Sequence, residues 1–187
     1  YIYWKQYGLD PDYIQVFNQK RKINFFPISE AFVGESILSY TLPTYAWIFN
    51  SGRIKIYSPL SLQNKWKSNT TKDDLFFEND FEYENLMVTS SYKDALVLSK
   101  SLKCSFRAFN SERVVSIIPE VERFNKKLIS FDNDPTGIEF QNKASKQLEI
   151  EAYNYIGKEK DWAEAYKNNL EECEKNIQVI KDTYFYY

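Results

Sequence analysis

The chain has 187 residues, with 24 Lys or Arg, 26 Asp or Glu and no His, which gives a formal net charge of −2. This length is typical of one compact domain with an appendage and is enough to bury a hydrophobic core. An aromatic content of 18% with only 5 glycines and 6 prolines excludes a disordered or collagen-like chain. The lack of His excludes Ser-His-Asp and Cys-His nucleophilic sites and His-ligated zinc.

Charge balance and cysteine content narrow the protein class further. A nearly neutral chain has no overall basic field of the kind that nucleic-acid binders carry, although a local basic patch is compatible with it. Cys104 and Cys173 form no C-x-x-C pair, so we expect reduced thiols and neither a zinc ribbon nor a disulfide framework. No apolar run reaches the ~18 residues of a membrane span, and no signal peptide opens the chain. We therefore expect a soluble, cytoplasmic protein without membrane contact, and a first residue other than Met predicts a piece of a longer one.

The first part of the chain predicts two helices followed by a β-hairpin. Gly8 is typical of the end of a short helix, and Asp10 before Pro11 is typical of the start of a second. In residues 45–49, aromatic side chains occupy every second position, and in residues 53–57 Arg53 and Lys55 alternate with isoleucines. This two-residue period on both sides of a Gly-containing turn predicts the hairpin.

The rest of the chain predicts a loop and then alternating strands and helices. Residues 58–80 are polar and turn-rich, which is typical of a loop or linker. Strands separated by short helices indicate βαβ units and a parallel sheet. The expected strands are 86–89, 104–109 and 127–131, and the expected helices are 94–102, 118–124 and 135–150. A last helix over 160–183 carries an apolar stripe, which either packs on the domain or docks a partner.

Two acidic residues follow the third expected strand. Because ligands of open parallel sheets gather at the carboxyl ends of the strands, Asp132 and Asp134 lie where a site is expected. Two carboxylates two residues apart can converge on a hard cation such as Mg²⁺. The alternative is that Asp134 only caps the helix that begins at Pro135.

Polar residues also follow the other two expected strands. Ser90 or Ser91 is suited to cap a helix, and Asp94 falls in its first turn, where the helix dipole favours an anion. Glu112 follows the second strand and either faces the same cleft or is an ordinary surface residue.

These segments together resemble a known domain. The strand and turn leading to Asp94, and the strand followed by Asp132-Asn-Asp-Pro-Thr-Gly137, are similar to the toprim domain, which replicative primases, topoisomerases and some nucleases share. The resemblance covers roughly residues 85–150. It implies an α/β fold with a parallel sheet, helices on both faces and a Mg²⁺-binding acidic cleft. The domains that we expect are an α+β subdomain containing the hairpin over 1–80, a toprim domain over 81–158 and a C-terminal helix over 159–187.

Three further stretches resemble phage-type DNA primases. They are residues 45–59 followed by 65–69, the variant first motif 91–94, and Lys160-Asp-Trp-Ala-Glu164. The resemblance implies a primase catalytic core that synthesises RNA primers on single-stranded DNA from nucleoside triphosphates during phage replication. It also implies Mg²⁺ or Mn²⁺ as the cofactor and a replicative helicase, in cis or in trans, as a partner. We expect no zinc in this chain.

The chain departs from the toprim pattern at one position. The family carries a Glu-Gly pair before the first Asp, where this chain has Ser90 and Ser91. A serine hydroxyl is un-ionised near neutral pH and replaces neither a general base nor a metal-binding carboxylate well. Glu112 is our candidate for the missing carboxylate, because adjacent strands are ~4.8 Å apart and their ends share a cleft.

The resemblance assigns roles to the candidate residues. Asp132 and Asp134 are the expected metal ligands, and Asp94 or Glu112 completes the catalytic set. Binding to template and nucleotide phosphates requires cations on the protein. The candidates are Arg53, Lys55, Lys65, Lys67 and Lys93, with Trp66 able to stack on a base. The alternative for this group is a solvated hairpin face.

Two other functions remain open at this point. The serines in the first motif favour a catalytically degenerate toprim module that binds nucleic acid or a replisome partner. A toprim nuclease would instead degrade single-stranded DNA with the same metals.

Overall fold

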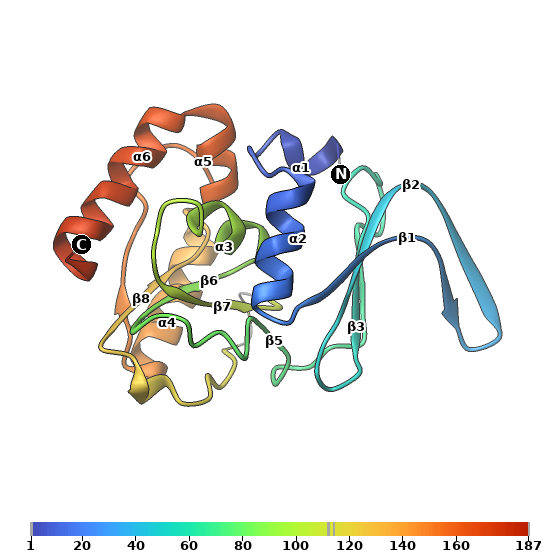
Figure 1. Ribbon diagram of the computed structural model, residues 1–187, viewed down its shortest axis with the longest axis horizontal. Helices are drawn as coiled ribbons and strands as arrows, with labels where there is room; N and C mark the ends of the chain where they lie inside the picture. The colour runs from blue at the N-terminus through green and yellow to red at the C-terminus, as the bar shows by residue number, and fades with distance from the viewer. Residues whose placement is uncertain (1, 112, 114, 187) are drawn as a thin grey trace.

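The computed structural model describes residues 2–111, 113 and 115–186, which form two β-sheets with helices around them (Figure 1). Sheet A is antiparallel with the order β1-β2-β3-β4, and sheet B has the order β5-β7-β6-β8-β9. In sheet B, β5 runs antiparallel to β7 and the other pairs are parallel. The predicted α/β class, with a parallel sheet preceded by a hairpin-containing part, is confirmed.

The strands are β1 (Asn24–Val33), β2 (Ser36–Ile48), β3 (Ile54–Tyr57), β4 (Trp66–Ser68), β5 (Leu75–Phe76), β6 (Asn85–Thr89), β7 (Ser105–Phe109), β8 (Lys126–Ser130) and β9 (Glu151–Ala152). The helices are α1 (Ile2–Lys5), α2 (Pro11–Lys20), α3 (Tyr92–Leu98), α4 (Pro135–Leu148), α5 (Trp162–Asn168) and α6 (Leu170–Val179), with a 3₁₀ turn η1 (Val121–Arg123) and a π-helical end η2 (Ile180–Phe185). None of the helices in the described part of the chain combines the length and apolarity of a bilayer-spanning segment.

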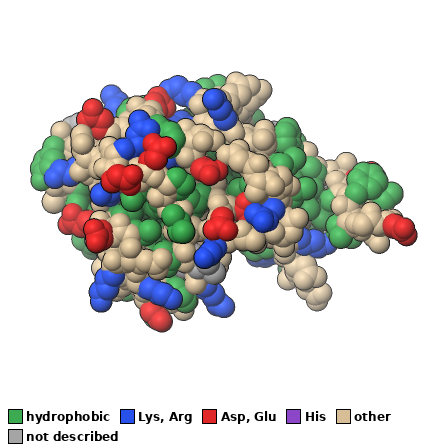
Figure 2. Space-filling model, turned by 90° about the horizontal axis from the view of Figure 1, so that it is seen from below, with side chains coloured by type: hydrophobic (Ala, Val, Ile, Leu, Met, Phe, Trp, Pro, Cys, Tyr) green, Lys and Arg blue, Asp and Glu red, His purple; other side chains and the backbone are tan. Residues whose placement is uncertain are grey.

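The predicted hairpin is present as β2 and β3, in which Tyr45 lies opposite Tyr57. β1 pairs along the other edge of β2, and the two strands continue beyond the body of the molecule as an arm (Figure 1). The end of the arm exposes Phe32, Val33 and Ile37. Figure 2 shows it as a narrow projection with hydrophobic and acidic side chains. Because residues 23–52 include no Lys or Arg, the arm offers no cation to a phosphate.

Three expected elements differ from the structure. Residues 58–80 were expected to be a loop but contain β4 and β5, whose three and two residues are too short to show a two-residue period. The helix expected over 118–124 is only the turn η1. The single helix expected over 160–183 is wrong: Asn169, with φ −149° and ψ 71°, separates α5 from α6 and caps α6 through its side chain. An apolar stripe continues across such a break, so periodicity alone does not reveal it.

Sheet B lies between two hydrophobic layers. Met87, Phe106 and Leu128 point to one face, where α3, α5, α6, the first two helices and sheet A complete a large cluster. Val88 and Ile129 point to the other, where α4 packs against β8 and β9. The first cluster extends in sequence from Trp4 to Phe185, so both ends of the described chain contribute to one core. Residues that alternate along one strand thus serve both layers, which is the pattern of a buried parallel sheet.

A buried ion pair attaches α2 to sheet B. The Arg21 Nε donates to Asp80 Oδ2 at 2.9 Å, and the backbone N–H of Phe106 in β7 donates to the same oxygen at 2.9 Å. The two charged side chains are only 8% and 1% exposed. Asp80 therefore joins a helix, a loop and a strand through one carboxylate.

Candidate functional site

The loops after β6 and β8 meet at the carboxyl end of sheet B. Thr89 and Ser130, the last residues of these neighbouring parallel strands, are directly paired. The residues that follow are therefore brought together, and the Ser90 hydroxyl donates to Asp132 Oδ1 at 2.7 Å. Ser90, from the first motif, and Asp132, from the loop after β8, therefore share one site.

Asp132 and Asp134, both in the loop after β8, converge on one ammonium group. Lys160 Nζ lies 3.3 Å from Asp132 Oδ2 and 3.2 Å from Asp134 Oδ2. The other oxygen of Asp134 accepts from the Gly137 N–H at 2.8 Å and caps α4, so the capping alternative holds for that oxygen. The Gly137 N–H and then Lys160 lower the pKa of Asp134. One oxygen of each negatively charged carboxylate therefore points at the same position.

Asn133, between the two aspartates, holds the segment that carries Lys160. Its backbone N–H donates to the Lys160 carbonyl at 2.5 Å. Its side-chain amide donates to the carbonyls of Gly157, at 3.0 Å, and Glu159, at 3.3 Å. The backbone of residues 157–160 is therefore fixed against the loop that carries the acidic pair.

Asp94 is enclosed and fully hydrogen-bonded, although it borders the cleft. It is 2% exposed; its Oδ1 accepts from the Ala163 N–H at 3.0 Å, and Ser91 donates to Oδ2 at 2.6 Å. Ser91 also caps α3 by accepting from the Asp94 N–H. Burial, and then the charge of Asp161, raise the pKa of Asp94 to about 8. One oxygen joins α3 to α5 and the other is held by the residue that caps α3, so in this conformation neither is directed at a ligand.

The raised pKa of Asp94 makes stability depend on pH. Between its ordinary pKa of 3.8 and its folded value of about 8, the folded state holds a proton that the unfolded state has released. The stabilisation is therefore complete below pH 4 and is lost as the pH rises toward 8. We expect Asp94→Asn, whose amide can donate to Ser91, to remove this dependence and to unfold at a higher urea concentration than the original chain at pH 8.

Urea unfolding at pH 5 and pH 8, followed by circular dichroism, measures this effect. Asp73→Asn, at an exposed position, is the matched control and should keep the pH dependence of the original chain. An equal pH dependence in Asp94→Asn and the original chain would contradict the assignment.

A cleft of about 900 Å³ lies between sheet A and these loops. Among its walls are eight of the residues singled out from the sequence: Lys55, Lys65, Trp66, Ser90, Ser91, Lys93, Asp94 and Asp132. Arg53, Lys67 and Asp134 are not among the residues that line it. Arg53 lies 3.5 Å from Asp74, and Lys67 faces the ring of Tyr40. Glu112 lies outside the described residues, so its expected role in the site stays a prediction.

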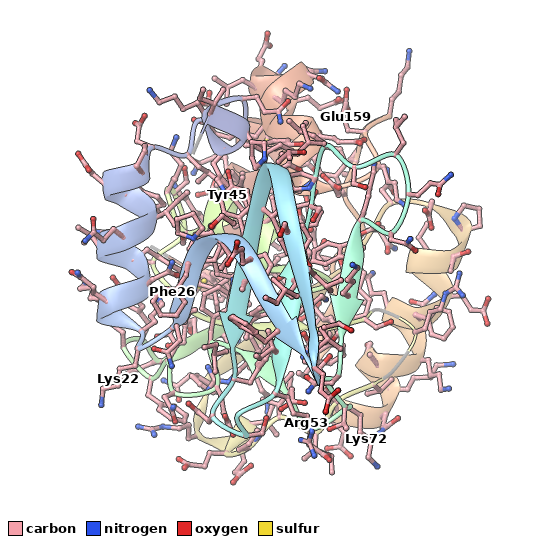
Figure 3. All side chains as sticks on the ribbon, turned by 90° about the vertical axis from the view of Figure 1, so that its right-hand side faces the viewer. Lys22, Phe26, Tyr45, Arg53, Lys72 and Glu159 are labelled. Atoms are coloured by element: carbon pink, nitrogen blue, oxygen red, sulfur yellow. The ribbon has the colours of Figure 1, made fainter. Side chains whose placement is uncertain are left out.

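Several further residues line the cleft that no sequence pattern marks as candidate site residues. These are Trp4, Trp47, Tyr57, Ser68, Thr70, Thr71, Lys72, Phe76, Asn110, Ser111, Ser116, Lys160, Asp161 and Glu164. In Figure 3, Lys72 lies at the same end of the view as Arg53, and Glu159 lies at the opposite end. The last three belong to the Lys-Asp-x-x-Glu motif whose resemblance to primases was noted above, although the motif alone gave them no role in the site.

Lys55 lines the cleft and packs against aromatic rings. Its side chain donates to the Asn110 carbonyl and lies 4.5 Å from the centroid of the Trp66 ring. Burial lowers the pKa of Lys55 to about 8. A nearby phosphate would favour its charged form, so this lysine is suited to an anionic ligand.

Trp66 offers a flat apolar surface at the same place. Its ring stacks on Tyr57 with the centroids 4.0 Å apart and 15° between the planes, and the residue is 50% exposed. An aromatic ring that is fixed from behind and open to solvent is suited to stacking on a base. Lys93, which also lines the cleft, is paired with Asp161 at 3.4 Å. Burial opposes the charge of Lys93, but Asp161 and Asp94 raise its pKa above the ordinary value.

The acidic pair fits a divalent cation if that ion receives further oxygen ligands. Two carboxylate oxygens lie within 3.3 Å of one ammonium nitrogen, so they converge on a single point. Mg²⁺ in nucleotide chemistry is commonly held by one or two carboxylates, with water and phosphate supplying the rest. In the residues that the structure describes, no group of three or more His, Cys, Asp or Glu is arranged to hold a metal. Asp132 and Asp134 are the residues that would hold the ion.

No family model matches the chain, and no curated protein matches its sequence. The primase fragment of the bacteriophage T7 primase-helicase protein is similar in structure, with a TM-score of 0.62 and 15% identity over 87% of this chain and 70% of that one. The Aquifex aeolicus primase, with its zinc binding and RNA polymerase domains, gives a TM-score of 0.64 and 14% identity. The match covers 95% of this chain and 54% of that one.

The RNA polymerase domain of the Mycobacterium tuberculosis primase gives a TM-score of 0.60 and 10% identity over 97% of this chain and 74% of that one. These similarities show that the chain has the fold of primase catalytic cores. They confirm the resemblance to primase cores at the level of the fold, while the toprim domain itself is matched by no family model.

Proposed function

We propose that the chain is a primase-type nucleotidyltransferase core that joins nucleoside triphosphates into RNA primers on single-stranded DNA. One observation carries the proposal: in a primase-core fold, Asp132 and Asp134 converge on one cationic position beside the cleft. The T7 neighbour is a fragment of a primase-helicase protein, and a replicative helicase is the partner that we propose.

The side chains around the cleft divide the expected tasks. A bound Mg²⁺ or Mn²⁺ would neutralise triphosphate charge and orient the reacting oxygens. Lys55 and Lys65 bind phosphates, and Trp66 stacks on a base of the template or nucleotide. Ser90 keeps Asp132 oriented through its hydroxyl, but an un-ionised hydroxyl does not act as the general base.

Primer synthesis tests the proposal directly. The original chain should incorporate labelled ribonucleotides on single-stranded DNA in the presence of Mg²⁺ or Mn²⁺. Asp132→Asn should lower the rate by about 100-fold, because it weakens the charge stabilisation at the reacting phosphate. Asp73→Asn is the matched control and should retain the activity. Equal rates for Asp132→Asn and the original chain would contradict the proposal, and degradation of the DNA would favour a nuclease.

A second candidate is a module that binds nucleic acid without catalysis. Two observations favour it: Ser90 stands where the toprim pattern has Glu, and an ammonium group lies between the two carboxylates. Single-stranded DNA that quenches the tryptophan fluorescence of the chain, without any nucleotide incorporation, would support this candidate over the first.

A further inference from the structure

We infer that Lys160 is a tethered cation that holds the acidic pair until a divalent metal ion displaces it. The inference rests on the metal site of the proposed function and adds a property of this chain's own side chain. Its ammonium nitrogen is 3.3 Å from Asp132 Oδ2 and 3.2 Å from Asp134 Oδ2. These are the two oxygens that are directed at the point where the ion would bind.

The ammonium and a divalent ion exclude each other from this position. Lysine is positively charged at neutral pH, and like charges at this separation repel. Ser90 adds a hydroxyl but no charge to the pair, so Lys160 supplies the positive charge closest to it in the described residues. A metal ion that enters must therefore break both Lys160 contacts.

The surroundings allow the Lys160 side chain to leave while its backbone stays. Asn133 fixes the Lys160 carbonyl, and Asp161 caps α5 immediately after it by accepting from the Glu164 N–H at 2.7 Å. The Lys160 side chain itself is 51% exposed. A rotation of that side chain is enough to vacate the position, so the pair can change ligand without movement of the loop.

The displaced ammonium remains beside the site. Lys160 lines the same cleft as Lys55 and Trp66, and its backbone is anchored next to Asp132. A phosphate that arrives with the metal ion would be within reach of the released ammonium. Metal entry and phosphate binding are thereby coupled, and the free ion alone binds more weakly than an unobstructed pair would bind it.

Calorimetric titration with MnCl₂ alone tests the inference on the whole chain. We expect Lys160→Gln to bind Mn²⁺ about tenfold more tightly than the original chain, because no ion pairs have to be broken. Lys158→Gln makes the same change of charge two residues away, at an exposed position, and should alter the affinity less than twofold. Lys160→Arg keeps the cation and should bind no more tightly than the original chain.

Thermal unfolding provides a readout that is independent of activity. Mn²⁺ should raise the unfolding temperature of Lys160→Gln more than that of the original chain, since a ligand of the folded state stabilises according to its affinity. Affinity that is unchanged or weaker in a folded Lys160→Gln, or tighter binding by Lys160→Arg, would overturn the inference. Tighter Mn²⁺ binding by Lys160→Gln without primer synthesis by the original chain would support the inference while contradicting the proposed function.

Discussion

Replacing Gly137 by alanine is expected to destabilise the chain by about 3 kcal/mol and to weaken Mn²⁺ binding at the acidic pair. A Cβ atom at this position would overlap the backbone carbonyl oxygen of Asp132 and lie 2.8 Å from the Asp132 Cβ. The obstacle is backbone, so no side-chain rotation relieves it. Either the start of α4 or the loop that carries Asp132 has to move, and these two segments position the acidic pair.

Urea unfolding and Mn²⁺ calorimetry measure the two effects. Thr136→Ala, at the exposed neighbouring position of the same helix, is the control, and both of its values should stay close to those of the original chain. If Gly137→Ala unfolds at the original urea concentration, the close approach of α4 to this loop does not constrain the site.

Replacing Asp80 by alanine is expected to cost about 3–5 kcal/mol of unfolding free energy. The substitution leaves the buried Arg21 guanidinium with the longer 3.3 Å contact to the more exposed Glu82 and removes the acceptor of the Phe106 N–H. A buried charge that loses its closest partner keeps the cost of leaving water with much less compensating attraction. Asp80→Asn retains an acceptor for Phe106 and should lie between the alanine variant and the original chain.

The exposed ion pair nearby supplies the comparison. Lys20 contacts Glu82 at 2.5 Å, but its side chain is 58% exposed, so Lys20→Ala should change stability far less than Asp80→Ala. Urea unfolding measures all three variants. Equal losses of unfolding free energy in Asp80→Ala and Lys20→Ala would show that burial does not increase the contribution of the Arg21–Asp80 pair to stability.

The parallel sheet and the acidic residues at its edge were predictable because their signals are local. β6, β7 and β8 each contain a short group of apolar residues, and each is followed by turn-forming polar residues. Ser90 and Asp132 meet because the structure places β6 and β8 next to each other as parallel strands. The start of α4 at Pro135 was equally local, since Asp134 and Pro135 fix it.

Other features depend on contacts that the sequence does not display. The position of Lys160 follows from hydrogen bonds between Asn133 and a segment about 25 residues away, and no periodic pattern encodes them. β5 is a two-residue strand that exists because β7 offers it an edge. The enclosure of Asp94 likewise depends on the docking of α5, so its commitment to Ala163 could not be read from the first motif.

The shared core of the two chain ends also determines when folding can finish. The Tyr13 hydroxyl pairs with Ser99 at 2.6 Å, and Lys100 donates to the Gly8 carbonyl at 2.8 Å, so the first helices are held by residues translated much later. Contacts between such distant segments slow folding, because a long loop must close before they contribute. During translation, the apolar faces of α1 and α2 therefore stay uncovered until these later segments emerge, and exposed apolar surface of this kind is prone to aggregation.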